Sequence, residues 1–138
     1  MITRDDLIGT WRLKSWTSLK NGEPVGYPMG EDAKGQIIYS PEGRMSGFLM
    51  RRDFAEQPRD TAASPDICLA YGGDFRVEGD EVIHDVDVAT VPYWIGNPLI
   101  RTVVLQGENV LLKTKPETTS SGNTYEHHLL WERIGGEP

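Results

Sequence analysis

Two side chains of this sequence, His84 and Arg101, combine a proton acceptor with a permanent positive charge. A neutral imidazole can act as a general acid or base, and a guanidinium can stabilise the oxyanion that proton removal creates. With Tyr125 as proton donor, these residues would serve an isomerase, cyclase or lyase. Without any reaction, His84 and Arg101 would orient a carboxylate, enolate or phenolate in a binding site. Both functions require the two side chains to share one cavity wall.

A tight turn at Gly79-Asp80 predicts which face of its two strands carries His84. In a hairpin with a two-residue loop at this position, Phe75 lies opposite His84. The alternating residues, including Asp85 and Asp87, then face solvent. The apolar face, which we expect to be the interior, comprises Phe75, Val77, Val82, His84, Val86 and Val88.

A second turn at Gly107-Glu108 places Arg101 on the apolar face of the next hairpin, together with Val103 and Leu112. If the strands that carry His84 and Arg101 are neighbours, the two side chains occupy direct or diagonal positions. A one-residue bulge would break this match, because it turns the following residues to the other face. No inward position of the predicted strands is Asp or Glu, so Arg101 either reaches solvent or binds an anionic ligand.

The elements that position these residues are short β-patterned runs separated by Gly, Pro, Asn and Asp. A short helical turn capped by Thr3 precedes the first run, and a second short helix is predicted over Pro65 to Ala70. The runs predict eight strands, at 9–18, 35–40, 45–50, 73–78, 81–89, 99–106, 109–114 and 124–133.

Short and long connections alternate along the chain. The short ones are the turns at 41–44, 79–80 and 107–108, and the long ones span 19–34, 51–72, 90–98 and 115–123. In an up-and-down meander, alternate connections lie at the same end, so the long loops form one mouth. We therefore predict an all-β fold, an eight-stranded antiparallel up-and-down β-barrel with an internal cavity. At its closed end, we expect the Arg133 guanidinium to lie over the Trp11 indole.

The first and last strands and one mouth loop add further candidates. In the first strand, alternation turns Ser15 and Thr17 inward and Trp16 outward, unless a bulge turns Trp16 in. Tyr93 and Trp94 lie in a mouth loop, where aromatic rings can cover an entering ligand. The predicted ligand-binding residues are Phe75, His84, Val86, Arg101, Val103, Leu112, Tyr125, His127, Leu129, Tyr93 and Trp94.

The chain has 138 residues, a net charge of −7 and scattered Lys and Arg residues. Nucleic-acid binding needs a concentrated basic patch, so we do not expect it. The apolar runs are far shorter than the ~20 residues of a membrane-spanning helix, and the N-terminus lacks the pattern of a secretory signal. Cys68 is the single cysteine, which leaves no partner for a disulfide within these residues. We expect one domain over residues 1–138, located in the cytoplasm.

The run Leu7-Ile8-Gly9-Thr10-Trp11 carries a Gly-x-Trp motif at the start of the first strand. Further stretches follow in order: Gly35 to Tyr39, Ser40 to Ser46, Val82 to His84, and Leu130 to Arg133. Together, these stretches resemble the lipocalin-like domain family of bacteria and fungi, in the calycin superfamily. The similar stretches are spread over nearly the whole chain.

The resemblance implies a barrel with an internal cavity and no particular reaction, because calycins include both carriers and enzymes. We predict that the chain binds one small, largely apolar molecule, with an anionic end as an option. The alternative is a small biosynthetic isomerase, cyclase or lyase. Since some calycin-like barrels bind haem, a haem-binding barrel with His84 as ligand is a second alternative. No metal site and no cofactor is predicted for the first two functions. The expected partners are the ligand and, as an open option, a second copy of the chain.

Overall fold

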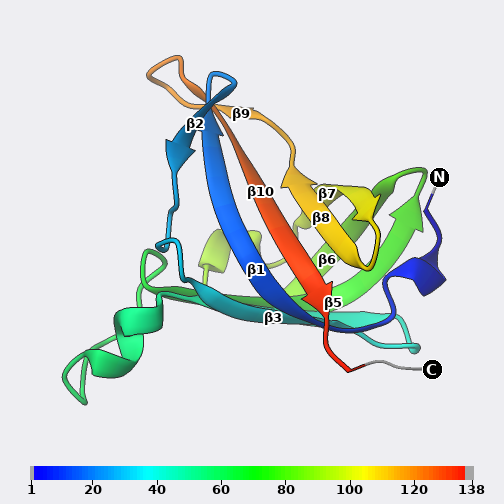
Figure 1. Cartoon of the computed structure of the whole chain (residues 1–138), viewed down its shortest axis with the longest axis horizontal. Coiled ribbons are helices and arrows are strands. Elements are labelled where there is room, and N and C mark those ends of the chain that lie inside the picture. Colours follow the sequence, from blue (N-terminus) through cyan, green and yellow to red (C-terminus); the bar gives the residue numbers. More distant parts are fainter. Residues whose placement is uncertain (1, 136–138) are drawn as a thin grey trace.

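The computed structural model describes residues 2–135 and consists mainly of β-strands. Eight strands form a ring: β1 (Gly9–Lys20), β3 (Lys34–Tyr39), β4 (Arg44–Met50), β5 (Cys68–Glu78), β6 (Glu81–Ala89), β7 (Pro98–Gln106), β8 (Asn109–Thr114) and β10 (Thr124–Arg133). Neighbours in this order pair antiparallel, and pairing between β1 and β10 closes the ring. The predicted eight-stranded antiparallel up-and-down barrel is confirmed (Figure 1).

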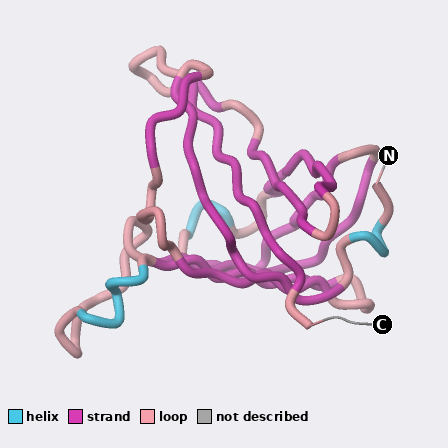
Figure 2. The backbone as a smooth tube through the Cα atoms, in the orientation of Figure 1, coloured by secondary structure: helices cyan, strands magenta, loops and turns pink. Residues whose placement is uncertain are grey.

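Two short strands and three 3₁₀ turns lie outside the ring. β2 (Glu23–Gly26) pairs with the end of β1, and β9 (Glu117–Thr118) pairs with the start of β10. There, β1 and β10 continue as a ribbon beyond the other strands (Figure 2). The helical turns are η1 (Arg4–Asp6), η2 (Arg52–Glu56) and η3 (Pro92–Trp94), of which η1 is the one predicted before the first strand. In the described part of the chain, no helix is long and apolar enough to cross a membrane.

Short and long connections separate to different ends of the barrel, as their alternation predicts. The turns that join β3 to β4, β5 to β6 and β7 to β8 lie on the right in Figure 1, near η1. Gly79 and Gly107 both have a φ of 65°, the left-handed conformation that tight hairpin loops require. The connections that carry η2 and η3 lie on the left.

Trp11 and Arg133 close the end of the barrel that carries the short turns. They are opposite each other in register, and the Arg133 Cζ lies 4.2 Å from the centroid of the Trp11 ring. Trp11 Nε1 donates to the Leu7 carbonyl (2.9 Å), and Arg133 Nη1 donates to the Ile8 carbonyl (2.7 Å). Gly9 has a φ of 135°, and a Cβ there would clash with Arg133, so the motif requires glycine at this position.

The predicted register of the β5–β6 and β7–β8 hairpins is confirmed. Phe75 lies opposite His84 in the first of them. β6 and β7 are neighbours, and Arg101 lies opposite Val82, two residues from His84. His84 and Arg101 therefore occupy diagonal positions on the same face, as the hairpin geometry predicts.

A bulge in β1 decides the direction of Trp16. The pairing with β10 shifts register between Leu13 and Ser15, so Trp16 points inward and is 9% exposed. The prediction allowed for a bulge that turns Trp16 inward, and the structure contains this bulge. The inward positions expected for Ser15 and Thr17 are wrong. A single extra residue on the bulged strand is enough to exchange the two faces.

A second bulge turns Val88 outward, so its predicted interior position is wrong. The pairing of β5 with β6 shifts between Gly72 and Gly73, and Val88 is 58% exposed. The strands approach so closely here that a Cβ on Gly73 would collide with the Asp85 backbone. Glycine is therefore required at the bulge.

β5 begins at Cys68, earlier than predicted, and the expected helix over Pro65 to Ala70 is wrong. A turn at Ser64 leads directly into the strand, with the Cys68 N–H donating to the Ser64 carbonyl (2.9 Å). Leu69 and Tyr71 then pair with β4 and continue the inward face of β5. Pairing with a neighbouring strand thus outweighs the weak local helical tendency.

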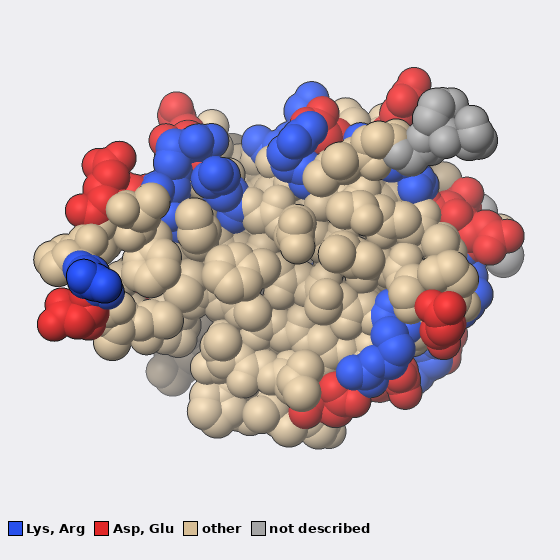
Figure 3. Space-filling view, turned by 90° about the horizontal axis from the view of Figure 1, so that it is seen from below, with Lys and Arg blue, Asp and Glu red and all other residues tan. Residues whose placement is uncertain are grey.

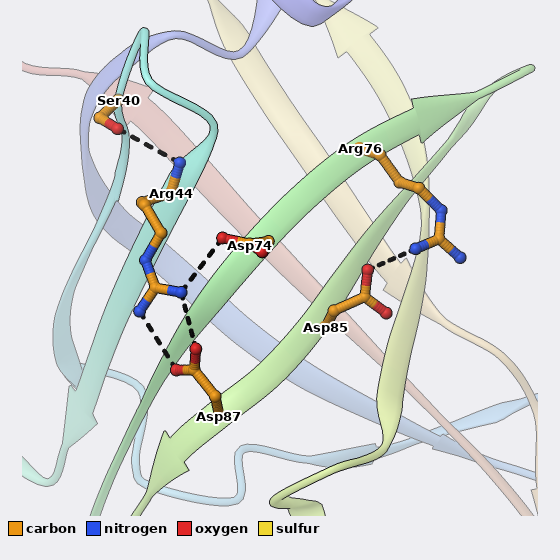
Figure 4. A network of polar contacts seen from close by, with 6 residues as sticks. All are labelled: Ser40, Arg44, Asp74, Arg76, Asp85 and Asp87. Carbon is orange, nitrogen blue, oxygen red and sulfur yellow. Dashed lines mark hydrogen bonds and ion pairs between the residues drawn. The ribbon is translucent and has the colours of Figure 1, made fainter.

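The outer surface carries the charged groups of the barrel wall. Arg44 donates to Asp74 (3.1 Å) and to Asp87 (2.7 Å), and Arg76 pairs with Asp85 (Figure 4). The predicted outward direction of Asp85 and Asp87 is confirmed. Such exposed pairs contribute little stability. On the side of the molecule seen in Figure 3, charged residues gather at the periphery and the centre is uncharged.

Candidate ligand cavity

An apolar cavity of about 160 Å³ lies inside the barrel. An apolar cavity of ~150 Å³ in another protein holds benzene, so this space suits roughly one aromatic ring. Gly47 contributes a part of the wall that has no side chain. The aliphatic and indole side chains of the wall belong to Trp16, Ile37, Leu49, Leu69, Trp94, Leu112, Leu129 and Trp131.

Arg101 brings a positive charge to this apolar wall. Its guanidinium donates from Nη1 to the carbonyl of Ile100 (3.2 Å). Within residues 2–135, none of the ion pairs includes Arg101. The residues that line the cavity include neither Asp nor Glu. A guanidinium in this setting is free to form charge-assisted hydrogen bonds with an anionic ligand.

His84 is fully buried and is held between two tyrosines. Its Nε2 lies 2.7 Å from the Tyr39 hydroxyl, and its Nδ1 lies 2.9 Å from the Tyr71 hydroxyl. Tyr39 belongs to β3, Tyr71 to β5 and His84 to β6, so the three side chains connect strands across the interior. Tyr71 lines the cavity, whereas Tyr39 and His84 lie behind its wall.

The buried histidine and tyrosines are uncharged at neutral pH. Burial, and then the positive charge of Arg101, lower the pKa of His84 to about 3. Burial raises the pKa of both Tyr39 and Tyr71, and the charge of Arg101 opposes this rise. Arg101 is therefore the charged member of this group.

His127 is a second histidine, and it lines the cavity directly. Its Nδ1 accepts a hydrogen bond from Trp16 Nε1 (3.2 Å) and lies 2.8 Å from the Ser18 hydroxyl. An indole N–H can only donate, so Nδ1 is the unprotonated nitrogen. Burial, and then the charge of Arg101, lower the pKa of His127. The neutral ring therefore carries its hydrogen on Nε2.

Two further donors belong to the wall. The buried Nε1–H of Trp131 has no acceptor among residues 2–135. The Thr114 hydroxyl oxygen accepts from the backbone N–H of His127 (2.8 Å), which leaves the hydroxyl hydrogen free to donate. The polar part of the wall is thus rich in hydrogen-bond donors.

The sequence profile of the lipocalin-like domain family matches residues 8–134, which span the barrel from β1 to β10. The chain belongs to the lipocalin-like domain family. This confirms the resemblance carried by the Gly-x-Trp motif and the C-terminal stretch. A lipocalin-like barrel with an apolar interior space is the kind of fold that encloses a small molecule. Comparison with curated proteins found no match.

The lipocalin-like cavity brings together some of the predicted ligand-binding residues and not others. Trp94, Arg101, Leu112, His127 and Leu129 line it. His84 lies behind Tyr71, and Phe75, Val86 and Val103 are buried outside the lining. Tyr93 is 75% exposed, and Tyr125 lies where β10 pairs with β9 on the protruding ribbon.

Sequence reasoning missed the two tyrosines that hold His84. The predicted loop over 51–72 included Tyr71, although Leu69 and Tyr71 continue the alternation that reaches Phe75, and this was the available signal. Tyr39 lay in a predicted strand, but nothing in its own neighbourhood indicates a partner on β6. Its contact with His84 depends on closure of the barrel.

A haem group does not fit this lipocalin-like barrel. Both ring nitrogens of His84 are hydrogen-bonded to tyrosine hydroxyls, and His84 does not line the cavity. A space comparable with one that holds benzene is also far smaller than a porphyrin. Over residues 2–135, no group of three or more His, Cys, Asp or Glu side chains could hold a metal ion.

Proposed function

We propose that this lipocalin-like protein binds a small molecule with an apolar body of about one ring and an anionic end. The observation that carries the proposal is the donor-rich polar part of an otherwise apolar cavity, centred on Arg101. Apolar pockets with a few convergent polar groups are typical of small-molecule sites.

The two parts of the cavity contribute differently to binding. Each methylene-sized group that leaves water adds about 0.8 kcal/mol, whatever the ligand's polar end. A charge-assisted hydrogen bond adds about 1.5–3 kcal/mol, which corresponds to about ten- to a hundredfold in affinity. The apolar wall therefore supports affinity in general, and Arg101 supports preference for an anion.

Binding is better supported than catalysis by an isomerase, cyclase or lyase mechanism. A general base has to reach the substrate proton, but His84 lies behind Tyr71 and the Nδ1 of His127 is occupied by Trp16. Tyr125, the expected proton donor, lies on the ribbon outside the cavity lining.

Replacing Arg101 with methionine tests the proposal. We expect Arg101→Met to weaken binding of benzoate by about ten- to a hundredfold, and to change binding of benzamide, a neutral molecule of similar size, very little. Tryptophan fluorescence can follow both titrations, because Trp16, Trp94 and Trp131 line the cavity. The midpoint of thermal unfolding should stay at or above the wild-type value, since methionine removes an unpaired charge from an apolar wall.

Arg12→Met is the matched control. Arg12 pairs with Glu132 on the outer surface, so its loss changes the net charge equally without touching the cavity. Both affinities should then remain at the wild-type values. Equal losses for benzoate and benzamide in Arg101→Met would contradict a charge-selective site. If benzoate fails to saturate the wild-type protein, the binding proposal itself is wrong.

A further inference from the structure

Tyr39, His84 and Tyr71 form a chain of hydrogen bonds that can run in two directions. His84 Nε2 faces the Tyr39 hydroxyl, and Nδ1 faces the Tyr71 hydroxyl. A neutral imidazole has one N–H donor and one acceptor nitrogen, so one tyrosine donates to His84 and the other accepts from it. In either direction, the tyrosine that accepts from His84 has a hydroxyl hydrogen with no partner among these three residues.

Tyr39 decides between the two directions. It is 1% exposed, and His84 Nε2 is the hydrogen-bond partner of its hydroxyl among residues 2–135. If Nε2 carried the hydrogen, Tyr39 would accept, and its own O–H would be buried without an acceptor. That loss disfavours the second direction, because Tyr39 lies behind the cavity wall, whereas Tyr71 lines the cavity. Tyr39 therefore donates to Nε2, and the Nδ1–H of His84 donates to Tyr71.

Tyr71 is left with a free hydroxyl hydrogen, and Tyr71 lines the cavity. Arg101 on the same wall is a donor and cannot accept this hydrogen. The neutral state of His84, which this direction requires, agrees with its burial and with the diagonal position of Arg101. The Tyr71 hydrogen is therefore available to a ligand.

His127 also keeps a hydrogen-bond donor, and its contacts are independent of those of His84 and Tyr71. Trp16 Nε1 occupies its Nδ1, so the donor that remains is Nε2–H. The buried Nε1–H of Trp131 has no acceptor in the described part of the chain. Tyr71, Arg101 and His127 all line the cavity, and each keeps a hydrogen-bond donor that the contacts described above do not use.

We infer that Tyr39 and His84 are positioning residues that hold Tyr71 as a donor, so that the cavity takes carboxylates, phenolates and enolates and disfavours alcohols, phenols and amines. The Arg101 guanidinium and the Nε2–H of His127 cannot accept the hydrogen of an alcohol or amine. Unpaired buried polar groups weaken binding strongly. The inference rests on the proposed function and narrows its ligand class.

Nitrogen-15 NMR of the ligand-free protein tests the direction of the chain. We expect hydrogen on Nδ1 of His84 and on Nε2 of His127, so the two histidines should be opposite tautomers. Hydrogen on Nε2 of His84 would overturn the inference and leave the proposed function untouched.

Tyr39→Phe tests the consequence for binding. The variant removes the donor to Nε2, so His84 no longer has to donate to Tyr71. We expect benzoate affinity to fall about three- to tenfold, although Tyr39 does not line the cavity. Toluene, an apolar probe of similar size, should bind as in the wild type. Tyr93→Phe removes an exposed hydroxyl and should change neither affinity.

A double variant separates positioning from general damage to the fold. Tyr71→Phe should lose at least as much benzoate affinity as Tyr39→Phe, and the double variant no more than Tyr71→Phe, because Tyr39 acts through Tyr71. Additive losses, or an equal loss of toluene binding in Tyr39→Phe, would overturn the positioning role. If the wild type does not bind benzoate, the proposed function fails. The His84 tautomer measured by NMR still shows in which direction the hydrogen bonds between Tyr39, His84 and Tyr71 run.

Discussion

Acidification should destabilise the wild-type protein much more than a His84→Gln variant. The pKa of His84 is about 3 in the folded protein and 6.5 in its ordinary state, because burial and Arg101 disfavour the imidazolium. Between these values the unfolded chain binds more protons than the folded one. The free energy of unfolding therefore falls by roughly 1.4 kcal/mol for each pH unit below 6.5, and by about 3 kcal/mol at pH 4.

Urea unfolding at a series of pH values measures this effect. A glutamine amide can accept from Tyr39 and donate to Tyr71, but it does not titrate. The difference between the two stability curves therefore isolates His84 from His127 and the carboxylates, which titrate in both proteins. The difference should be constant above pH 6.5 and shrink below it. Parallel curves down to pH 4 would mean that folding does not suppress protonation of His84.

Trp11→Ala should lower the free energy of unfolding by about 3–5 kcal/mol, the usual cost of truncating a buried tryptophan. Trp11 is 3% exposed, packs under Arg133 and donates to the Leu7 carbonyl. Its loss would leave a cavity at the closed end and a guanidinium without its aromatic surface. Chemical unfolding measures the change directly.

Trp11→Phe is the informative companion, because it keeps an aromatic ring below Arg133 and removes the hydrogen bond to Leu7. It should lower the free energy of unfolding clearly less than Trp11→Ala does. In both variants, the ratio of benzoate to benzamide affinity should match the wild type, since Trp11 does not line the cavity. Unchanged unfolding of Trp11→Ala would mean that this end of the barrel is closed by other contacts.

Hairpin geometry made much of the barrel predictable from the sequence. Glycine in the turns at Gly79 and Gly107 defines short loops, and a short loop determines which residues face each other. The diagonal positions of His84 and Arg101 follow from this register and from the up-and-down order of strands. The closing pair of Trp11 and Arg133 follows from closure alone.

The polar network around His84 could not be predicted in the same way. Tyr39 and His84 are 45 residues apart and lie on strands that are not neighbours in the ring. Trp16 reaches the cavity because of a bulge, and alternation alone gives no sign of a bulge. The alternation of residues along a strand predicts the direction of a side chain. Its partner on the far side of the barrel interior depends on how the whole barrel packs.

Gly47 has no side chain, and this allows the volume of the cavity to change separately from its charge. A Cβ at Gly47 would lie 3.5 Å from Ile37 Cγ1, an ordinary contact distance, and the backbone there is not left-handed. Alanine can therefore occupy this position without strain and reduce the volume of the apolar part, while Arg101 and Tyr71 keep their places. The size limit for a ligand is thus open to change at one residue, independently of its charge. Under the proposed function, a change at this one position would alter the size of the ligand that fits and leave Arg101, the group that would recognise an anionic end, in place.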